Sequence, residues 1–109
     1  MTVAATFEIE YLQYLGPDGK LVAEPPPALR DGKALLPLFK QMLFVRTFDT
    51  KSIALQRTGT LGTYAACLGH EATHVGIGAS LQPEDGFAPS YRDYGAQFMT
   101  GMQPREVLL

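Results

Sequence analysis

The sequence contains one cysteine, no tryptophan and no asparagine among its 109 residues. A single cysteine, Cys67, excludes an internal disulfide, and a reducing compartment is the simpler expectation. No apolar run approaches the roughly 18 to 20 residues that a membrane-spanning helix needs, and residues 1–6 lack the positive charge that begins a secretory signal. We therefore expect a cytoplasmic protein without membrane contact.

An excess of basic charge is also lacking. Nine Lys and Arg residues stand against eleven Asp and Glu residues, which gives a net charge of −2 without a basic block. Such a chain cannot neutralise a row of phosphates, so nucleic acid is not an expected partner. A hydrophobic share of 46% is ordinary for a globular protein, and the length fits one small domain or a piece of a larger one.

Residues 1–30 are expected to form an N-terminal extension. Apolar residues alternate with polar ones over Phe7–Tyr11, which is typical of a half-exposed strand. A turn at residues 16–19 then allows a short return strand, so that a small β-hairpin results. The extension ends in a polyproline spacer at Glu24–Pro27.

Residues 31–109 are expected to begin a second, mostly helical domain. Helical spacing predicts a long helix from about Leu35 or Leu36, with Pro37 in its first turn, to the turn at Gly59. Its apolar stripe comprises Leu35, Leu38, Phe39, Met42, Leu43, Val45 and Phe48, and its opposite, polar face comprises Lys40, Gln41, Asp49 and Lys51.

A second helical pattern covers residues 69–79. Glycine inside a helix costs up to about 1 kcal/mol relative to alanine, so Gly76 and Gly78 indicate the close approach of another backbone. The remaining expected elements are an extended segment or short strand at residues 87–91 and helices at residues 93–100 and 104–109.

Tyr91 and Arg92 are the leading candidates for a binding site. Arginine presents a planar fork of donors that suits phosphate, and the tyrosine hydroxyl adds another donor. The N-terminus of the helix expected at residues 93–100 follows them and favours an anion. The alternative is structural, with Arg92 paired to a carboxylate at the surface and Tyr91 in the core.

His70 and His74 have the i, i+4 spacing of zinc ligands, and the segment between them matches the short His-Glu-x-x-His pattern of metalloproteases. That pattern needs a third ligand downstream, and the chain has no other histidine. We therefore assign no metal ligand, and expect Glu71 to cap or pair locally, His70 to lie near solvent and Cys67 to be a buried small residue. A zinc hydrolase is the lesser alternative.

Short motifs follow one another in a fixed order along the chain: Arg46–Asp49, Gln56–Gly59, Gly62–Tyr64, Gly69–Ala72, Val75–Gly76 and Pro89–Ala96. Each motif is weak alone, but their order resembles the N-terminal part of the alpha subunit of thiamine-diphosphate-dependent 2-oxoacid dehydrogenases. Within that family, the motifs resemble those of bacterial pyruvate dehydrogenase E1 alpha subunits. Residues 7–14 are also similar to the leader of that group.

The resemblance implies an α/β fold in which helices sandwich a parallel sheet. This chain would be the N-terminal portion of a thiamine-diphosphate-binding fold, mostly helical as it stands with the small hairpin in front. The implied enzyme decarboxylates pyruvate oxidatively and transfers the acetyl group to a lipoyl group on E2. By position, Tyr91 and Arg92 would hold the diphosphate, and Thr63 and Tyr64 would line the active-site side of the glycine turn. No catalytic residue is carried over to this chain.

The resemblance also implies partners and a metal. The family assembles as an alpha2beta2 heterotetramer with an E1 beta subunit, and it binds thiamine diphosphate with magnesium between the subunits. Its metal ligands come from Gly-Asp-Gly and a later Asn-Asn pair, because magnesium needs oxygen ligands. This chain has no asparagine. We therefore expect an N-terminal fragment of an E1 alpha subunit that is inactive alone and binds thiamine diphosphate and magnesium negligibly.

Two alternatives stay open at this point. The substrate could be a branched-chain 2-oxoacid, because the pocket that selects it depends on residues outside this chain. The chain could instead be a non-catalytic interaction module, whose helices dock onto the beta subunit or onto a second copy.

Overall fold

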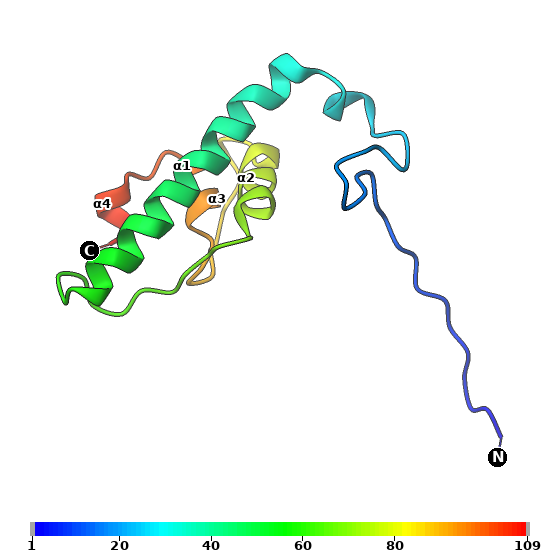
Figure 1. Ribbon diagram of the computed structural model, residues 1–109, viewed down its shortest axis with the longest axis horizontal. Helices are drawn as coiled ribbons and strands as arrows, with labels where there is room; N and C mark the ends of the chain where they lie inside the picture. The colour runs from blue at the N-terminus through cyan, green and yellow to red at the C-terminus, as the bar shows by residue number, and fades with distance from the viewer. Residues whose placement is uncertain (1, 109) are drawn as a thin grey trace. The chain divides into compact units, whose positions relative to one another are not determined.

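The computed structural model describes residues 2–108, and the chain divides into two compact units, Met1–Asp31 and Gly32–Leu109. The helices of the second unit, labelled in Figure 1, are α1 (Gly32–Arg57), α2 (Glu71–Ser80), α3 (Tyr94–Met99) and α4 (Pro104–Val107). The expectation of a mostly helical chain is confirmed. No strand forms among the described residues, and the parallel sheet of the expected α/β fold stays a prediction.

The small β-hairpin expected in the first unit is wrong. Within residues 2–31, a single isolated bridge joins Leu15 to Leu21 around a turn in which Gly19 has a φ of +76°. Phe7 and Ile9, expected on a strand, are 77% and 85% exposed. A two-stranded ribbon is stable only when its apolar face packs on something, and these side chains have no such cover within their unit.

The spacer after this turn is extended, as expected, at Pro26, where φ is −53° and ψ is 151°. It then leads into a short 3-10 helix, η1 (Pro27–Leu29). Arg30 folds back over the spacer, donates to the Pro25 carbonyl at 2.7 Å and pairs with Glu24 at 2.7 Å. Because these groups are exposed, the pair contributes little stability.

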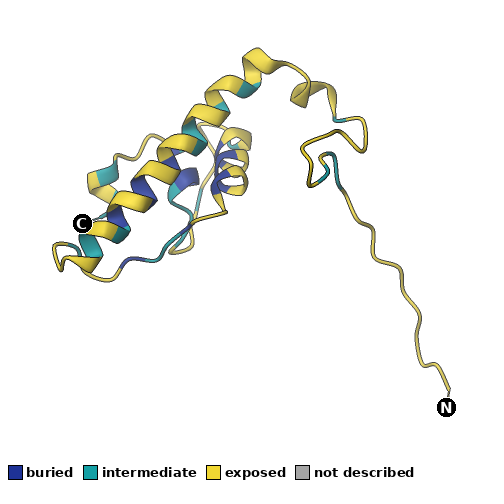
Figure 2. Ribbon diagram, in the orientation of Figure 1, coloured by how far each residue is buried: buried dark blue, intermediate teal, exposed yellow. Residues whose placement is uncertain are grey.

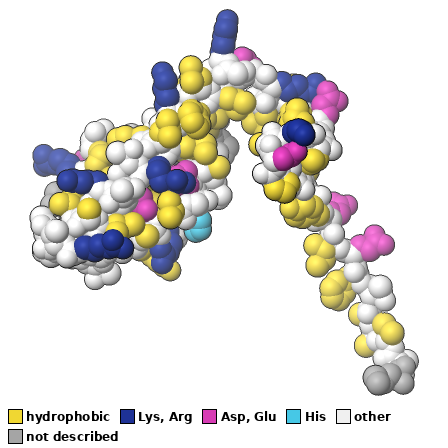
Figure 3. Space-filling view, in the orientation of Figure 1, with side chains coloured by type: hydrophobic (Ala, Val, Ile, Leu, Met, Phe, Trp, Pro, Cys, Tyr) yellow, Lys and Arg dark blue, Asp and Glu magenta, His cyan; other side chains and the backbone are white. Residues whose placement is uncertain are grey.

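Helix α1 begins at Gly32, three residues earlier than expected, and Pro37 lies inside it. The expected position of Pro37 in the first turn is therefore wrong, and inside the helix its ring removes one backbone hydrogen bond of the ladder and crowds the carbonyl four residues before it. The expected stripe is buried only in part: Val45 and Phe48 are in the core, whereas Phe39 and Leu43 are about half exposed. Figure 3 shows apolar atoms on the surface of the N-terminal turns of α1.

The core lies between the C-terminal half of α1, α2 and α3, as the dark blue segments in Figure 2 show. Phe48 is its centre, with its ring 4.8 Å from that of Phe98, 5.8 Å from that of Tyr94 and 6.1 Å from that of Tyr64. All three pairs are edge-to-face, which is a favourable geometry for aromatic rings. Aromatic packing therefore ties α1 to α3 and to the segment between α1 and α2.

Glycine allows α2 and α3 to cross closely. A Cβ at Gly78 would lie 2.3 Å from the Cβ of Met99, and a Cβ at Gly95 would lie 2.6 Å from the Cβ of His74. Real Cβ atoms do not approach so closely, so the expected close approach at Gly78 is confirmed. Gly76 is exposed with open space around it, so the same expectation is wrong there.

Helix α4 begins where the sequence predicts, with Pro104 in its first turn. The Glu106 carboxylate accepts the backbone N–H of Gln103 at 2.7 Å, which closes a capping box. The segment at residues 87–90 forms neither a strand nor a helix. None of the helices within residues 2–108 has both the length and the apolar character that crossing a bilayer requires.

Candidate functional site

Two irregular segments of the second unit carry the candidate residues. The first, residues 58–70, leaves α1 through Gly59, whose φ of +73° and N–H bond to the Gln56 carbonyl at 3.0 Å end the helix. The second, residues 90–93, is a turn that leads into α3. Contacts between these segments and α1 build the site.

Asp49 on α1 organises the first segment. Its side chain is 1% exposed, and its Oδ1 accepts the Tyr64 hydroxyl at 2.9 Å and the backbone N–H of Cys67 at 2.8 Å. The expectation that Asp49 lies on the solvent face is wrong. The sequence did indicate the burial of Asp49. The i, i+3, i+4, i+7 spacing of one buried stripe is followed by Val45, Phe48, Asp49 and Ser52.

Tyr64 is buried, with 8% of its surface exposed. Its ring stacks on that of Tyr94 at 5.2 Å, and its hydroxyl is bound to Asp49. Burial, and then this hydrogen bond, raise the pKa of Tyr64 above its ordinary value. The phenol is therefore neutral and fixed, and a role for Tyr64 beside a cofactor stays a prediction.

Tyr91 and Arg92 lie on the second segment and have different surroundings. Tyr91 is 72% exposed, so the alternative that placed it in the core is wrong. The Arg92 guanidinium carbon lies 5.1 Å from the centre of the Tyr91 ring, within cation–π range. Its Nη1 donates to the Ala66 carbonyl on the first segment. This bond uses one of the five N–H donors of the guanidinium, and its partner is a carbonyl rather than a carboxylate.

His74 supports the second segment from α2. Its side chain is 2% exposed, and its Nε2 lies 3.5 Å from the Asp93 carboxylate, which accepts the Ser90 N–H at 2.7 Å. Burial lowers the pKa of His74, and the Asp93 charge opposes that shift. The hydrogen bonds from Ser90 lower the pKa of Asp93. The turn that carries Arg92 thus rests on a buried imidazole.

Glu71 is bound by groups other than a metal. Its Oε1 pairs with Arg46 Nε at 2.5 Å, and its Oε2 accepts the Gly69 N–H at 3.0 Å. The hydrogen bond from Arg46 lowers the pKa of Glu71 to about 2. The expected local pairing of Glu71 and the exposure of His70 are confirmed. Within residues 2–108, no three His, Cys, Asp or Glu side chains gather as metal ligands do.

Cys67 is 1% exposed, and its expected burial is confirmed. Burial, and then the negative charge of Asp49, raise the pKa of its thiol to about 12. A nucleophilic cysteine needs a thiolate at neutral pH. The environment of Cys67 therefore favours packing over chemistry.

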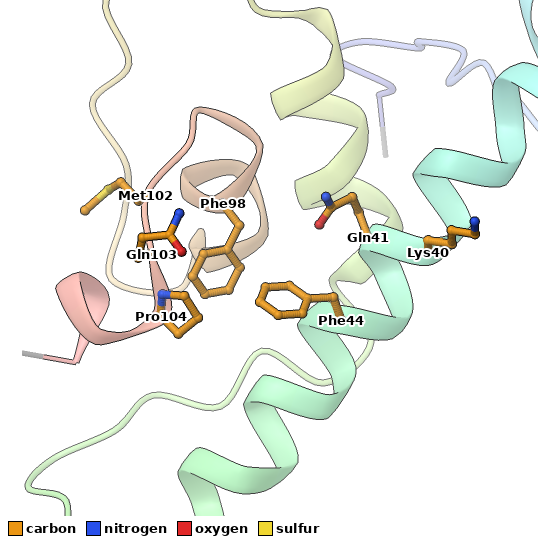
Figure 4. A pocket seen from close by; sticks show the side chains of 7 residues that line it. All are labelled: Lys40, Gln41, Phe44, Phe98, Met102, Gln103 and Pro104. Atoms are coloured by element: carbon orange, nitrogen blue, oxygen red, sulfur yellow. The ribbon is translucent and has the colours of Figure 1, made fainter.

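A pocket of about 300 Å³ opens on a different set of residues from those above. Figure 4 shows the rings of Phe44 and Phe98 next to each other in its lining, with their centres 5.2 Å apart in an edge-to-face contact, while Lys40 extends away from both rings. Gln103 and Pro104 close the side towards α4. No buried, charged group points into this pocket from its lining residues, so it offers little for a charged ligand.

Comparison with known proteins shows which family the chain resembles. The model of the dehydrogenase E1 component family matches residues 39–109. The chain is 36% identical over 107 residues to the 3-methyl-2-oxobutanoate dehydrogenase subunit alpha of Mycobacterium tuberculosis, with 92% of this chain and 28% of that protein covered. It is 40% identical over 92 residues to the pyruvate dehydrogenase E1 component subunit alpha of Bacillus cereus, with coverages of 84% and 24%.

A third relative is the subunit of the same name from Staphylococcus aureus, 35% identical over 103 residues, with 94% of this chain and 28% of that protein covered. No solved structure matches the chain. The chain thus spans about a quarter of the length of these curated relatives. Because the family model covers most of its residues, the chain belongs to the dehydrogenase E1 component family.

Proposed function

We propose that this chain is the N-terminal part of the alpha subunit of a 2-oxoacid dehydrogenase E1 component, and that Tyr91 and Arg92 bind the diphosphate of thiamine diphosphate. The observation that carries the proposal is the position and the contacts of these two side chains. A phenol and a guanidinium lie together on one turn, and the guanidinium is held at one nitrogen by Ala66. Arginine binds phosphate through several N–H groups at once.

The residues of this chain suit the diphosphate better than the metal. Arg92 and the exposed Tyr91 offer donors and one positive charge to an anion. Magnesium needs about six oxygen ligands, and the described part of the chain brings no three acidic or histidine side chains together. When bound, thiamine diphosphate supplies the electron sink for decarboxylation, while this chain contributes to holding its charged end.

The substrate and partners are part of the proposal. We propose pyruvate as substrate, an E1 beta subunit in an alpha2beta2 heterotetramer and a lipoyl-bearing E2 as partners, and a cytoplasmic location. The similarity to the Bacillus cereus and Staphylococcus aureus subunits supports pyruvate. The similarity to the Mycobacterium tuberculosis subunit favours 3-methyl-2-oxobutanoate as the second candidate, because it extends over 107 residues.

A chimera tests the proposal. Residues 1–109 would replace the aligned segment of the Bacillus cereus subunit, and the assembled enzyme would be titrated with thiamine diphosphate. We expect Arg92→Ala to weaken cofactor binding roughly tenfold to a hundredfold, because a hydrogen bond to a charged group contributes about 1.5 to 3 kcal/mol. Arg57→Ala, which removes an exposed arginine from the end of α1, is the matched control.

The chimera also separates the alternatives. Unchanged cofactor affinity in Arg92→Ala would contradict the binding role. Turnover of pyruvate against 3-methyl-2-oxobutanoate distinguishes the two substrates. The isolated chain should give no heat on titration with thiamine diphosphate and magnesium, and micromolar binding in that experiment would refute the proposal that the rest of a subunit is required. A chimera that assembles but lacks activity would favour the interaction module.

A further inference from the structure

One peptide group lies between Asp49 and Arg92. The N–H of the Ala66–Cys67 peptide belongs to Cys67 and donates to Asp49 Oδ1 at 2.8 Å. The carbonyl of the same peptide belongs to Ala66 and accepts Arg92 Nη1. A buried carboxylate on α1 and a guanidinium on the turn before α3 therefore bind the two ends of a single planar unit.

The polarity of this arrangement is favourable at both ends. The positive end of the peptide dipole faces the carboxylate, and its negative end faces the guanidinium. Hydrogen bonds in such a chain polarise one another, so a negative charge on Asp49 makes the Ala66 carbonyl a stronger acceptor. Because Asp49 is 1% exposed, water does not screen this effect as it does at the surface.

The arrangement also gives the buried charge a counterpart. A buried carboxylate is costly unless hydrogen bonds and a nearby cation offset the loss of hydration. Asp49 receives the Tyr64 hydroxyl and the Cys67 N–H, the charge of Arg46 acts on it, and Arg92 adds positive charge at the far side of the peptide. An asparagine at position 49 could accept the same two hydrogen bonds without a charge. The two bonds alone therefore do not explain why this position carries an aspartate.

We infer that Asp49 is a positioning residue for Arg92, and that it sets the direction of the guanidinium through the Ala66–Cys67 peptide group. This inference rests on the proposed function, in which Arg92 binds the diphosphate. Asp49 holds one nitrogen of the fork on the peptide carbonyl, so that the remaining donors keep one orientation. Asp49 itself touches neither cofactor nor substrate.

The first test uses the 109-residue chain itself and needs no cofactor. Nitrogen-15 NMR would follow the Arg92 guanidinium in Asp49→Asn, which keeps the shape of the side chain and removes its charge. We expect proton exchange and rotation at Nη1 to become roughly twofold to fourfold faster, because the loss of the Asp49 charge weakens the polarisation of the Ala66 carbonyl while the bond from Arg92 stays charge-assisted. Ser52→Ala, at an equally buried position one turn along α1, should leave the signal unchanged.

A substitution at the other end of the peptide group, at Arg92, tests the inference if Asp49→Asn does not fold. Arg92→Ala removes a partly buried side chain, and it should shift the Cys67 amide proton upfield and speed its exchange, although Arg92 does not bind that N–H. Arg57→Ala should leave the Cys67 amide unchanged. An unaltered Cys67 amide in Arg92→Ala would overturn the inference.

The second test measures thiamine diphosphate affinity in the chimera as a double-mutant cycle. We expect Asp49→Asn to weaken binding about threefold to tenfold, and to add nothing to Arg92→Ala, because both changes act on one interaction. Independent, additive losses would mean that Asp49 affects binding by a route other than Arg92, and would overturn the inference while the proposed function stands. No loss in Arg92→Ala would instead contradict the proposed function.

Discussion

Residues 32–44 and residues 45–57 belong to one helix, and both halves carry apolar side chains at helical spacing. In the second half Val45 and Phe48 are 0% and 8% exposed, whereas in the first half Phe39 is 53% exposed. The difference lies in what covers them, because the core residues of α2 and α3 pack against the second half. Periodicity thus selects the face of a helix, and burial requires a second element on that face.

The largest expected difference between the halves is in the free energy of unfolding. Phe48→Ala should destabilise the chain by about 3 to 5 kcal/mol, because it leaves a cavity among three aromatic rings. Phe39→Ala should cost less than about 1 kcal/mol, because that ring is half exposed. Urea unfolding measures both, and equal losses would show that the first half is also covered in solution.

Two glycines of α2 also differ in whether another helix covers them, and the expected effects on stability are smaller. Gly78→Ala should destabilise the chain by about 1 to 3 kcal/mol, because its Cβ would collide with Met99 across the crossing with α3. Gly76→Ala should stabilise it by up to about 1 kcal/mol, because that position is open and alanine favours the helix. Thermal unfolding followed by circular dichroism distinguishes the two signs, and a loss at both positions would contradict this packing.

The ion pair of Arg46 and Glu71 lies where the covered half of α1 begins. It should make the stability of that half depend on pH. The pKa of Glu71 is lowered from 4.5 to about 2, chiefly by the Arg46 hydrogen bond. Its contribution to stability is therefore complete above pH 4.5 and lost as the pH falls towards 2. Glu71→Gln should reduce this acid dependence, measured by urea unfolding at several pH values, and Glu84→Gln at an exposed position should not.

The smallest expected effect is on reactivity, without a change of stability. Cys67 in the covered region should react slowly with iodoacetamide at neutral pH, because its thiol is buried and its pKa is raised to about 12. In Leu43→Cys the added thiol lies in the uncovered half of α1, where Leu43 is 51% exposed, and it should react readily. Mass spectrometry counts the modified thiols, and rapid labelling of Cys67 would mean that the core opens.

Helical periodicity and turn residues were enough to predict the four helices found within residues 32–108, because those signals are local. The Phe7–Tyr11 strand could not be judged this way, since alternation describes a face and says nothing about a partner strand. Asp49 was misplaced because an acidic residue usually lies at the surface, although its spacing from Val45 and Phe48 pointed inwards. Tyr91 and Arg92 were candidates by residue type, but the hydrogen bond of Arg92 to Ala66 joins residues 26 positions apart in the sequence.

The exposed, alternating segment at Phe7–Tyr11 has a consequence for self-association. Such a segment is a template for pairing between copies of a chain, because its backbone groups and one apolar face are available. Glu8 and Glu10 lie between the apolar residues, and pairing of two copies would bring four carboxylates together. Charged residues placed in this way act as gatekeepers against aggregation. Repulsion between these glutamates thus opposes the pairing of this apolar segment with the same segment of another copy.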